Sequence, residues 1–267
     1  RKDLDFSNIK LVFSPQHGTA HDGVNYLYKK MGIPFVEVAE QANPDPAFSN
    51  TKTPNPEESA AYELAIEYAI KEDADAAIST DPDADRLGVV VKHNENYVLL
   101  TGNQTGSILI DYVLMTKKEL NQLPLNPIIF NTVVTSDLGE KVANNYGVEV
   151  EKTLTGFKFI GDKIKKYQKT LEKNFVFGYE ESYGYLVEPF VRDKDALQAC
   201  VLIAEAIAYY KSKGLTLVDV LNALYDKYGY HLEEQMSLSL KGEAGSLKIK
   251  AILEHFRTAS ILEFSGI

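Results

Sequence analysis

The stretch ADAAISTDPDADRLGVVVK, residues 74–92, is the most informative part of this sequence. Within it, apolar residues lead into the acidic segment DPDADR at 81–86, and a second apolar run follows. Both flanks have the composition of short strands, so we expect the acidic segment to be a tight loop between them. Residues i, i+2 and i+4 share one face of an extended backbone, so the three carboxylates of this loop can converge on one point.

Three carboxylates so close together repel one another unless a cation lies among them. Oxygen ligands from Asp81, Asp83 and Asp85 suit Mg²⁺, which usually takes only part of its octahedral shell from protein. Arg86 directly follows them and could hold a phosphate with its two-pronged guanidinium group. A solvated acidic turn and a phosphatase-type aspartyl nucleophile are the alternatives. The EF-hand pattern fails, because position six is Arg86 and position twelve is Lys92.

Composition and charge argue against several classes of protein. The chain has 267 residues, 45% hydrophobic and 25% charged, which is ordinary for one large or two medium globular domains. Its 28 basic and 38 acidic residues give a net charge of −10, which argues against a nucleic-acid partner. No apolar run reaches the roughly 18 residues of a membrane span, and the single cysteine, Cys200, allows no internal disulfide. We therefore expect a cytoplasmic protein without nucleic-acid or membrane partners.

Hydrophobic periodicity predicts the same order of elements twice along the chain. The first copy has strands at 9–14 and 34–39, helices at 21–31 and 57–72, a strand–loop–strand at 76–91, a strand at 97–100 and a helix at 105–114. The second copy has a strand at 128–134, helices at 136–146 and 158–172, strands at 174–179 and 185–187, and a helix at 195–211. After these come a helix at 215–229, an alternating strand at 234–240 and a helix at 245–257.

Alternating strands and helices pack most naturally as sheets flanked by helices. We therefore predict an α/β fold of two similar units, each a mixed sheet flanked by helices. Four prolines make the stretch 42–56 irregular, and two more mark 121–127 as a linker between the units.

The segment TLTGFKFIG at 153–161 is a second candidate for chemistry. A Thr-Gly turn that opens a helix presents free backbone N–H groups and a hydroxyl, and Lys158 lies in the first helical turn. Such a turn could bind an anion. The simpler alternative is an N-cap at Thr155, with Gly156 easing the turn.

The segment GYEESYGY at 178–185 places two acids and a hydroxyl between aromatic residues at a strand–strand turn. Paired carboxylates with Ser182 are suited to binding sugar hydroxyls, and acid–base catalysis by one glutamate is the sharper alternative. The third interpretation is an exposed polar turn that has no functional role.

The segment RDKD at 192–195 precedes a long apolar helix. Asp193 or Asp195 can cap that helix, while Arg192 and Lys194 could face a phosphate or move a proton. His17 could line the same cleft, although a single loop histidine is weak evidence. Four loops lie at equivalent ends of their units. Together they carry metal ligands, cations and acceptors for hydroxyl groups, which indicates that the ligand is a sugar phosphate.

These four motifs resemble those of the α-D-phosphohexomutase superfamily in its bacterial phosphoglucomutase/phosphomannomutase form. They are TDPDADR at 80–86, TGFKFIG at 155–161, GYEESYG at 178–184 and RDKDAL at 192–197. In that family four domains surround a cleft, and the first three share an α/β topology. The resemblance implies that 1–122 is the metal-binding second domain, that 123–233 is the sugar-binding third domain, and that 234–267 begins the connection to a C-terminal domain.

The resemblance also implies roles for individual residues. Asp81, Asp83 and Asp85 match the Mg²⁺ ligands, and Arg86 matches their neighbour at the phosphoserine. Glu180 and Ser182 match the residues that bind sugar hydroxyls. The remaining matches are Thr155, Gly156, Phe157 and Lys158 in the sugar-binding loop, and Arg192 and Lys194 at the border of the cleft, with Lys194 as a possible acid–base or phosphate contact.

Family members interconvert hexose 1-phosphate and hexose 6-phosphate through a phosphoserine enzyme and a bisphosphorylated sugar. The resemblance favours glucose as the sugar and leaves mannose possible, with glucose 1,6-bisphosphate as activator of the full-length enzyme. The family's Ser-His-Asn-Pro-like motif does not occur here, and Ser260 lacks the residues that should follow it. Because both ends of the chain look cut, we expect an inactive fragment whose N-terminal and C-terminal domains lie elsewhere in the polypeptide. The alternative is a non-catalytic sugar-phosphate-binding or regulatory homologue.

Overall fold

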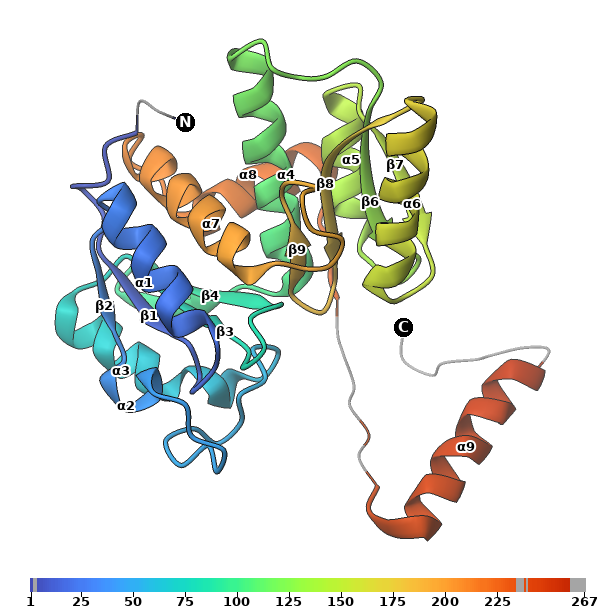
Figure 1. The fold of residues 1–267 in the computed structure, drawn as a ribbon, viewed down its shortest axis with the longest axis horizontal. Helices are drawn as coiled ribbons and strands as arrows, with labels where there is room; N and C mark the ends of the chain where they lie inside the picture. The colour runs from blue at the N-terminus through green and yellow to red at the C-terminus, as the bar shows by residue number, and fades with distance from the viewer. Residues whose placement is uncertain (2–3, 234–237, 239, 260–267) are drawn as a thin grey trace. The chain divides into compact units, whose positions relative to one another are not determined.

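The computed structural model describes residues 1, 4–233, 238 and 240–259 (Figure 1). Residue contacts divide the chain into two units, 1–231 and 232–267. The first unit contains both predicted sheets. The predicted strand at 234–240 lies mostly outside the described residues, and so does Ser260.

The first sheet contains five strands in the order β2-β1-β3-β4-β5. Its central strand β3 (Ala76–Thr80) pairs in parallel with β1 (Leu11–Ser14), which pairs in parallel with β2 (Phe35–Glu37). β4 (Leu87–His93) is antiparallel to β3 and to β5 (Asn96–Leu99). Every residue of β3 is buried, as its apolar composition predicted, and the acidic segment connects β3 to β4.

The second sheet has the order β7-β6-β8-β9, which repeats the order of the first four strands of the first sheet. β6 (Pro127–Thr132) pairs in parallel with β7 (Glu149–Thr153) and β8 (Asn174–Glu180), and β9 (Gly184–Leu186) is antiparallel to β8. The prediction of an α/β fold with two similar mixed sheets is therefore confirmed.

The helices of the first unit follow the predicted order, except that the short helix α2 was not predicted. They are α1 (Ala20–Met31), α2 (Ala39–Ala42), the 3₁₀ helix η1 (Ser59–Tyr62), α3 (Glu63–Glu72), α4 (Gly102–Glu119), α5 (Asp137–Asn145), α6 (Phe157–Thr170), α7 (Ala196–Lys211) and α8 (Leu217–Tyr228). The predicted helix at 57–72 was too long, because its first turn is the 3₁₀ helix η1. The predicted helix at 105–114 was too short, because Thr101 and Gln104 form a capping box that starts α4 earlier.

Helices cover both faces of each sheet in the first unit. In the first sheet, α3 packs on one face with Val12, Ala77 and Val90, and α1 and α7 lie over the other (Figure 1). In the second sheet, α6 packs on one face, and α4 and α5 lie over the other.

The two sheets share a continuous core. One apolar cluster includes Phe13 and Ile78 of the first sheet together with Ile129 and Tyr179 of the second. Helix α4 joins them, since it contacts β4 as well as β8, α5, α7 and α8. The boundary predicted at residue 122 stays a prediction.

The second unit contains α9 (Gly242–Thr258), in which Gly245 is buried against Leu240. Across the residues described in both units, none of the helices has the length and apolar character needed to cross a bilayer.

Candidate functional site

The acidic loop folds back on itself between β3 and β4. One oxygen of Asp81 (Oδ1) accepts hydrogen bonds from the backbone N–H groups of Asp85 and Arg86, at 3.0 and 2.9 Å. Ala84 has a positive φ of 60°, which lets the chain turn back toward Asp81. One carboxylate oxygen each of Asp81, Asp83 and Asp85 lies within 4.8 Å of the other two. The convergence that the spacing predicted is therefore present in the fold.

The electrostatics of this loop fit a bound cation. Burial, followed by the charges of Asp85 and Asp83, raises the pKa of Asp81 to about 7, although the N–H of Arg86 acts in the opposite direction. Oxygen Oδ1 of Asp85 is buried and has no hydrogen-bond partner among the described residues. A divalent cation would neutralise the crowded carboxylates and give that oxygen a partner, so the donor set suits a hard metal ion.

Two cationic side chains border the acidic loop. Nζ of Lys194 lies 2.8 Å from Oδ2 of Asp85, and Nε of Arg86 lies 3.7 Å from Oδ2 of Asp81 and 3.8 Å from Oδ1 of Asp85. Burial lowers the pKa of Lys194, but its hydrogen bond to Asp85 and the nearby carboxylate charges outweigh burial, so the pKa is raised overall. Lys194 is therefore charged at neutral pH.

The predicted loops meet through direct contacts, although they are far apart in sequence. Arg86 forms an antiparallel β-bridge with Gly184, and the backbone N–H of Leu87 donates to the carbonyl of Tyr183 at 2.9 Å. These contacts join the acidic loop to the turn between β8 and β9. The Lys194–Asp85 ion pair adds the segment at 192–195, so three of the four loops meet at the acidic residues.

The turn between β8 and β9 holds its two glutamates in different ways. Glu180 is buried and accepts a hydrogen bond from the backbone N–H of Gly156 at 2.8 Å, which brings in the fourth loop. Burial raises the pKa of Glu180, against the lowering effects of that N–H and of the Lys194 charge. Glu181 accepts instead from the hydroxyls of Thr132 and Thr135, at 2.8 and 3.2 Å. Ser182 is half-buried in the same turn.

The loop before α6 differs in one respect from its sequence-based interpretation. The N-cap of α6 is Gly156, with a φ of 117° and no side-chain capping bond, so the alternative of an N-cap at Thr155 was wrong. The N–H of Gly156 donates to Glu180 instead. Phe157 is buried, and Nζ of Lys194 lies 5.9 Å from its ring centre. Thr155 and Lys158 are exposed.

The segment before α7 separates its two cations. Asp195 caps α7 by accepting from the second and third helical N–H groups at 2.9 and 3.1 Å, which settles the choice between Asp193 and Asp195. The guanidinium group of Arg192 bonds to the carbonyl of Pro189 and to the side chain of Gln168. Those contacts do not involve the acidic loop, so the side chain of Arg192 is held away from the carboxylates.

Two features near the acidic loop were not found from the sequence. Glu57, in the turn that follows the proline-rich stretch, forms an ion pair with Nη1 of Arg86 at 2.5 Å. A Cβ at Gly18 would lie 2.4 Å from the Cα of Pro82, so only glycine allows this close approach beneath the acidic loop. No local pattern predicts either contact. His17, two residues into the turn after β1, bonds through Nδ1 to the carbonyl of Asn43 at 2.9 Å.

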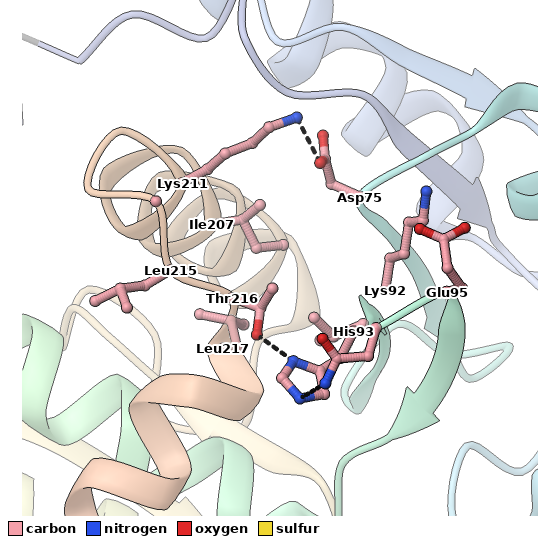
Figure 2. Close-up of a pocket in the computed structure, with 12 residues that line it drawn as sticks. Asp75, Lys92, His93, Glu95, Ile207, Lys211, Leu215, Thr216 and Leu217 are labelled. Atoms are coloured by element: carbon pink, nitrogen blue, oxygen red, sulfur yellow. Dashed lines mark hydrogen bonds and ion pairs between the residues drawn. The ribbon is translucent and has the colours of Figure 1, made fainter.

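A separate cavity of about 390 Å³ lies at the opposite end of the β3–β4 hairpin (Figure 2). Two of the polar groups at its rim already have partners: Lys211 lies 2.5 Å from Asp75, and Nδ1 of His93 lies 3.0 Å from the hydroxyl of Thr216 (Figure 2). Asp75 precedes β3 and His93 ends β4, whereas the acidic loop joins the other ends of these strands. The acidic loop therefore remains the candidate site.

Comparisons with known proteins agree with this geometry. The sequence model for phosphoglucomutase/phosphomannomutase, alpha/beta/alpha domain II, matches residues 2–94, and the model for domain III of the same family matches residues 101–228. The chain belongs to the phosphoglucomutase/phosphomannomutase family. The acidic loop falls within the domain II match, and α4 and the other three loops fall within the domain III match.

Relatives and solved structures support the same assignment. A phosphoglucomutase of Staphylococcus aureus (strain MRSA252) is 38% identical over 263 residues, which is 98% of this chain and 47% of that protein. A phosphoglucomutase/phosphomannomutase family protein of Burkholderia thailandensis has the same fold, with a TM-score of 0.66 and 21% identity over 83% of this chain and 44% of that one. A putative phosphomannomutase of Thermus thermophilus gives a TM-score of 0.65 and 21% identity over 83% of this chain and 46% of that one. The chain spans about half the length of the curated relatives it matches.

Proposed function

We propose that this chain is the metal-binding and sugar-binding middle part of a phosphohexomutase that interconverts hexose 1-phosphate and hexose 6-phosphate. The observation that carries the proposal is that four loops connect around the acidic residues: three contact one another there, and the fourth joins through Glu180. Through them a triad of carboxylates, a half-buried lysine and a buried glutamate come together. A relative named phosphoglucomutase, 38% identical, favours glucose, and mannose remains possible.

Asp81, Asp83 and Asp85 would hold Mg²⁺ through one oxygen each. When bound, the metal supplies positive charge that stabilises the oxygens of a transferring phosphoryl group. Arg86 and Lys194 border these carboxylates and add cationic donors beside them. Phosphate oxygens are acceptors for such donors, and the planar guanidinium group of Arg86 can offer two N–H groups at once.

Sugar binding and proton transfer fall to the turn between β8 and β9. Glu180 and Ser182 would bind sugar hydroxyls, with Thr155, Gly156, Phe157 and Lys158 contributed by the neighbouring loop and Arg192 at the border. Glu180 has a raised pKa and Lys194 keeps its proton, so these two are the candidates for the group that moves a proton to or from the sugar oxygen.

The rest of the mechanism is assigned to parts of the polypeptide outside this chain. We propose that a phosphoserine domain and a C-terminal phosphate-binding domain complete the enzyme, that glucose 1,6-bisphosphate activates it, and that it acts in the cytoplasm. The domain limits predicted from the sequence, 1–122 and 123–233 with 234–267 leading to the C-terminal domain, stay proposals, and the start of the domain III match at residue 101 favours an earlier boundary. The chain alone should not turn over.

Metal binding is the first test, and this chain suffices for it. Mn²⁺, a spectroscopic substitute for Mg²⁺, is titrated into the wild-type chain, into Asp83→Asn and into the control Asp22→Asn. Asp22 is a fully exposed aspartate on α1. We expect Asp83→Asn alone to weaken binding, because it removes one of three carboxylate ligands. Equal binding by all three proteins would refute the metal site.

Turnover is the second test. The longer polypeptide is assayed with glucose 1-phosphate and, separately, mannose 1-phosphate, in the presence of Mg²⁺ and a trace of glucose 1,6-bisphosphate. Activity in the longer polypeptide and none in this chain is the expected result. Activity in this chain alone would refute the assignment of the nucleophile to another domain. Metal binding without turnover on either sugar would favour the non-catalytic homologue.

A further inference from the structure

We propose that Glu57 is a positioning residue that holds the guanidinium group of Arg86 off the metal-binding carboxylates. The inference rests on the proposed function only in taking those carboxylates as metal ligands. It gives a role to the turn before η1, which the proposed function leaves without one.

The guanidinium group of Arg86 lies between Glu57 and the carboxylates of the acidic loop. Nη1 of Arg86 lies 2.5 Å from Oε1 of Glu57, whereas its Nε lies 3.7 Å from Asp81 and 3.8 Å from Asp85. The short contact is a charge-assisted hydrogen bond, and the two long ones exceed hydrogen-bonding distance. Both partners of the short contact are largely shielded from water, with side chains 18% exposed for Glu57 and 33% for Arg86. Glu57 therefore determines where the guanidinium group lies.

Glu57 is itself held in place. Its backbone N–H donates to the side chain of Asn55 at 3.1 Å, and the carbonyl of the preceding Pro56 accepts from the hydroxyl of Tyr62 at 2.8 Å. Tyr62 is completely buried beneath β4, where Gly88 leaves room for its hydroxyl. A buried tyrosine thus anchors the loop, and the loop presents a carboxylate to Arg86 at a fixed point.

Loss of the Glu57 charge would free Arg86 to turn toward Asp81 and Asp85. The guanidinium group would then occupy carboxylate oxygens that a metal ion needs, so cation binding would weaken although Glu57 is not a ligand. Removing any nearby negative charge also weakens cation binding through space. These two causes differ in one respect: only the first requires Arg86.

A double-mutant cycle on the full 267-residue chain separates the two causes. Affinity for Mn²⁺ is measured from the electron paramagnetic resonance signal of the free ion for wild type, Glu57→Gln, Arg86→Gln and the double variant. Glu58→Gln is the matched control, because this neighbouring carboxylate contacts Thr53 and Asn55 instead of Arg86. Glu57→Asp keeps the charge on a shorter side chain.

We expect Glu57→Gln to weaken Mn²⁺ binding about tenfold, a typical coupling within one ion-pair network. Glu58→Gln should stay within about twofold of wild type, and Glu57→Asp should recover much of the loss. In the Arg86→Gln background, Glu57→Gln should have no further effect. An undiminished effect in that background, or no effect in the wild-type background, would overturn the proposal.

A second measurement is independent of metal. In the metal-free chain, the Arg86 side-chain N–H signals in ¹⁵N NMR should be protected from exchange, and Glu57→Gln should shift them and remove that protection while Glu58→Gln leaves them unchanged. Unchanged Arg86 signals in Glu57→Gln would refute the positioning role. If the wild-type chain binds no Mn²⁺, the metal assignment fails, and the Arg86 signals still decide whether Glu57 positions the guanidinium group.

Discussion

Replacing Lys194 with glutamine should strengthen metal binding by the acidic loop. In the metal-free chain, Nζ of Lys194 lies 2.8 Å from Asp85 and its side chain is only 14% exposed. A metal ion must share Asp85 with this ammonium group, so the ion and the lysine repel each other. Glutamine removes the positive charge and keeps a polar side chain of similar length.

The size of the effect follows from Coulomb's law. A divalent ion held by Asp85 would lie roughly 4–5 Å from Nζ, and two unit charges at about 4 Å interact by about 1 kcal/mol in bulk water. Doubling the charge gives about 2 kcal/mol, which is roughly a thirtyfold change in affinity. Salt screening reduces this value, so we expect a gain of about tenfold at moderate ionic strength.

The assay is a Mn²⁺ titration at pH 8, where the carboxyl of Asp81, with its pKa of about 7, is mostly ionised. Lys166→Gln, an exposed lysine on α6, removes the same charge away from the carboxylates and serves as the control. Unchanged or weaker binding by Lys194→Gln, with normal binding by the control, would refute the competition between lysine and metal.

Two further predictions concern stability and reactivity. Gly88→Ala should lower the free energy of unfolding by about 1–3 kcal/mol, because its Cβ would lie 1.7 Å from the hydroxyl of buried Tyr62. Tyr62→Phe in the same chain should relieve part of that clash, so urea unfolding that shows the double variant to be less stable than Gly88→Ala would contradict the steric reason. Cys200 is completely buried, and burial raises the pKa of its thiol. It should resist a thiol reagent such as DTNB in the native chain and react fully after unfolding in guanidinium. Rapid stoichiometric labelling of the native chain would show that its surroundings open.

The sequence predicted those features of the fold and the site that depend on the spacing of neighbouring residues. Alternation brings Asp81, Asp83 and Asp85 together, and apolar runs on both sides of them give β3 and β4. The duplicated order of elements predicted two similar units, and the structure shows that the two sheets share the order of their first four strands.

Contacts between distant segments were beyond sequence reasoning. The Lys194–Asp85 ion pair depends on Gly184, because a Cβ there would lie 2.1 Å from the lysine side chain. No local sequence pattern predicts that the lysine side chain passes over this glycine. Glu57 was predicted to be the first residue of the helix at 57–72, whereas the structure places it in a turn before η1, and no local pattern predicted its contact with Arg86. The orientation of Arg192 toward Gln168 was equally unpredictable, because it depends on how α6 packs.

The shared core makes the two sheets a single cooperative body. The helix now seen as α4 was predicted at the end of the first copy, yet α4 falls within the domain III match and contacts β4 of the first sheet as well as β8, α5 and α8. A chain cut at residue 122 would leave apolar surface of α4 bare in one half and the matching surface of α5 and α8 bare in the other. Neither copy is therefore expected to fold independently of the other. The two should melt in one transition, so damage to either sheet loosens the acidic loop and the sugar-binding turn together.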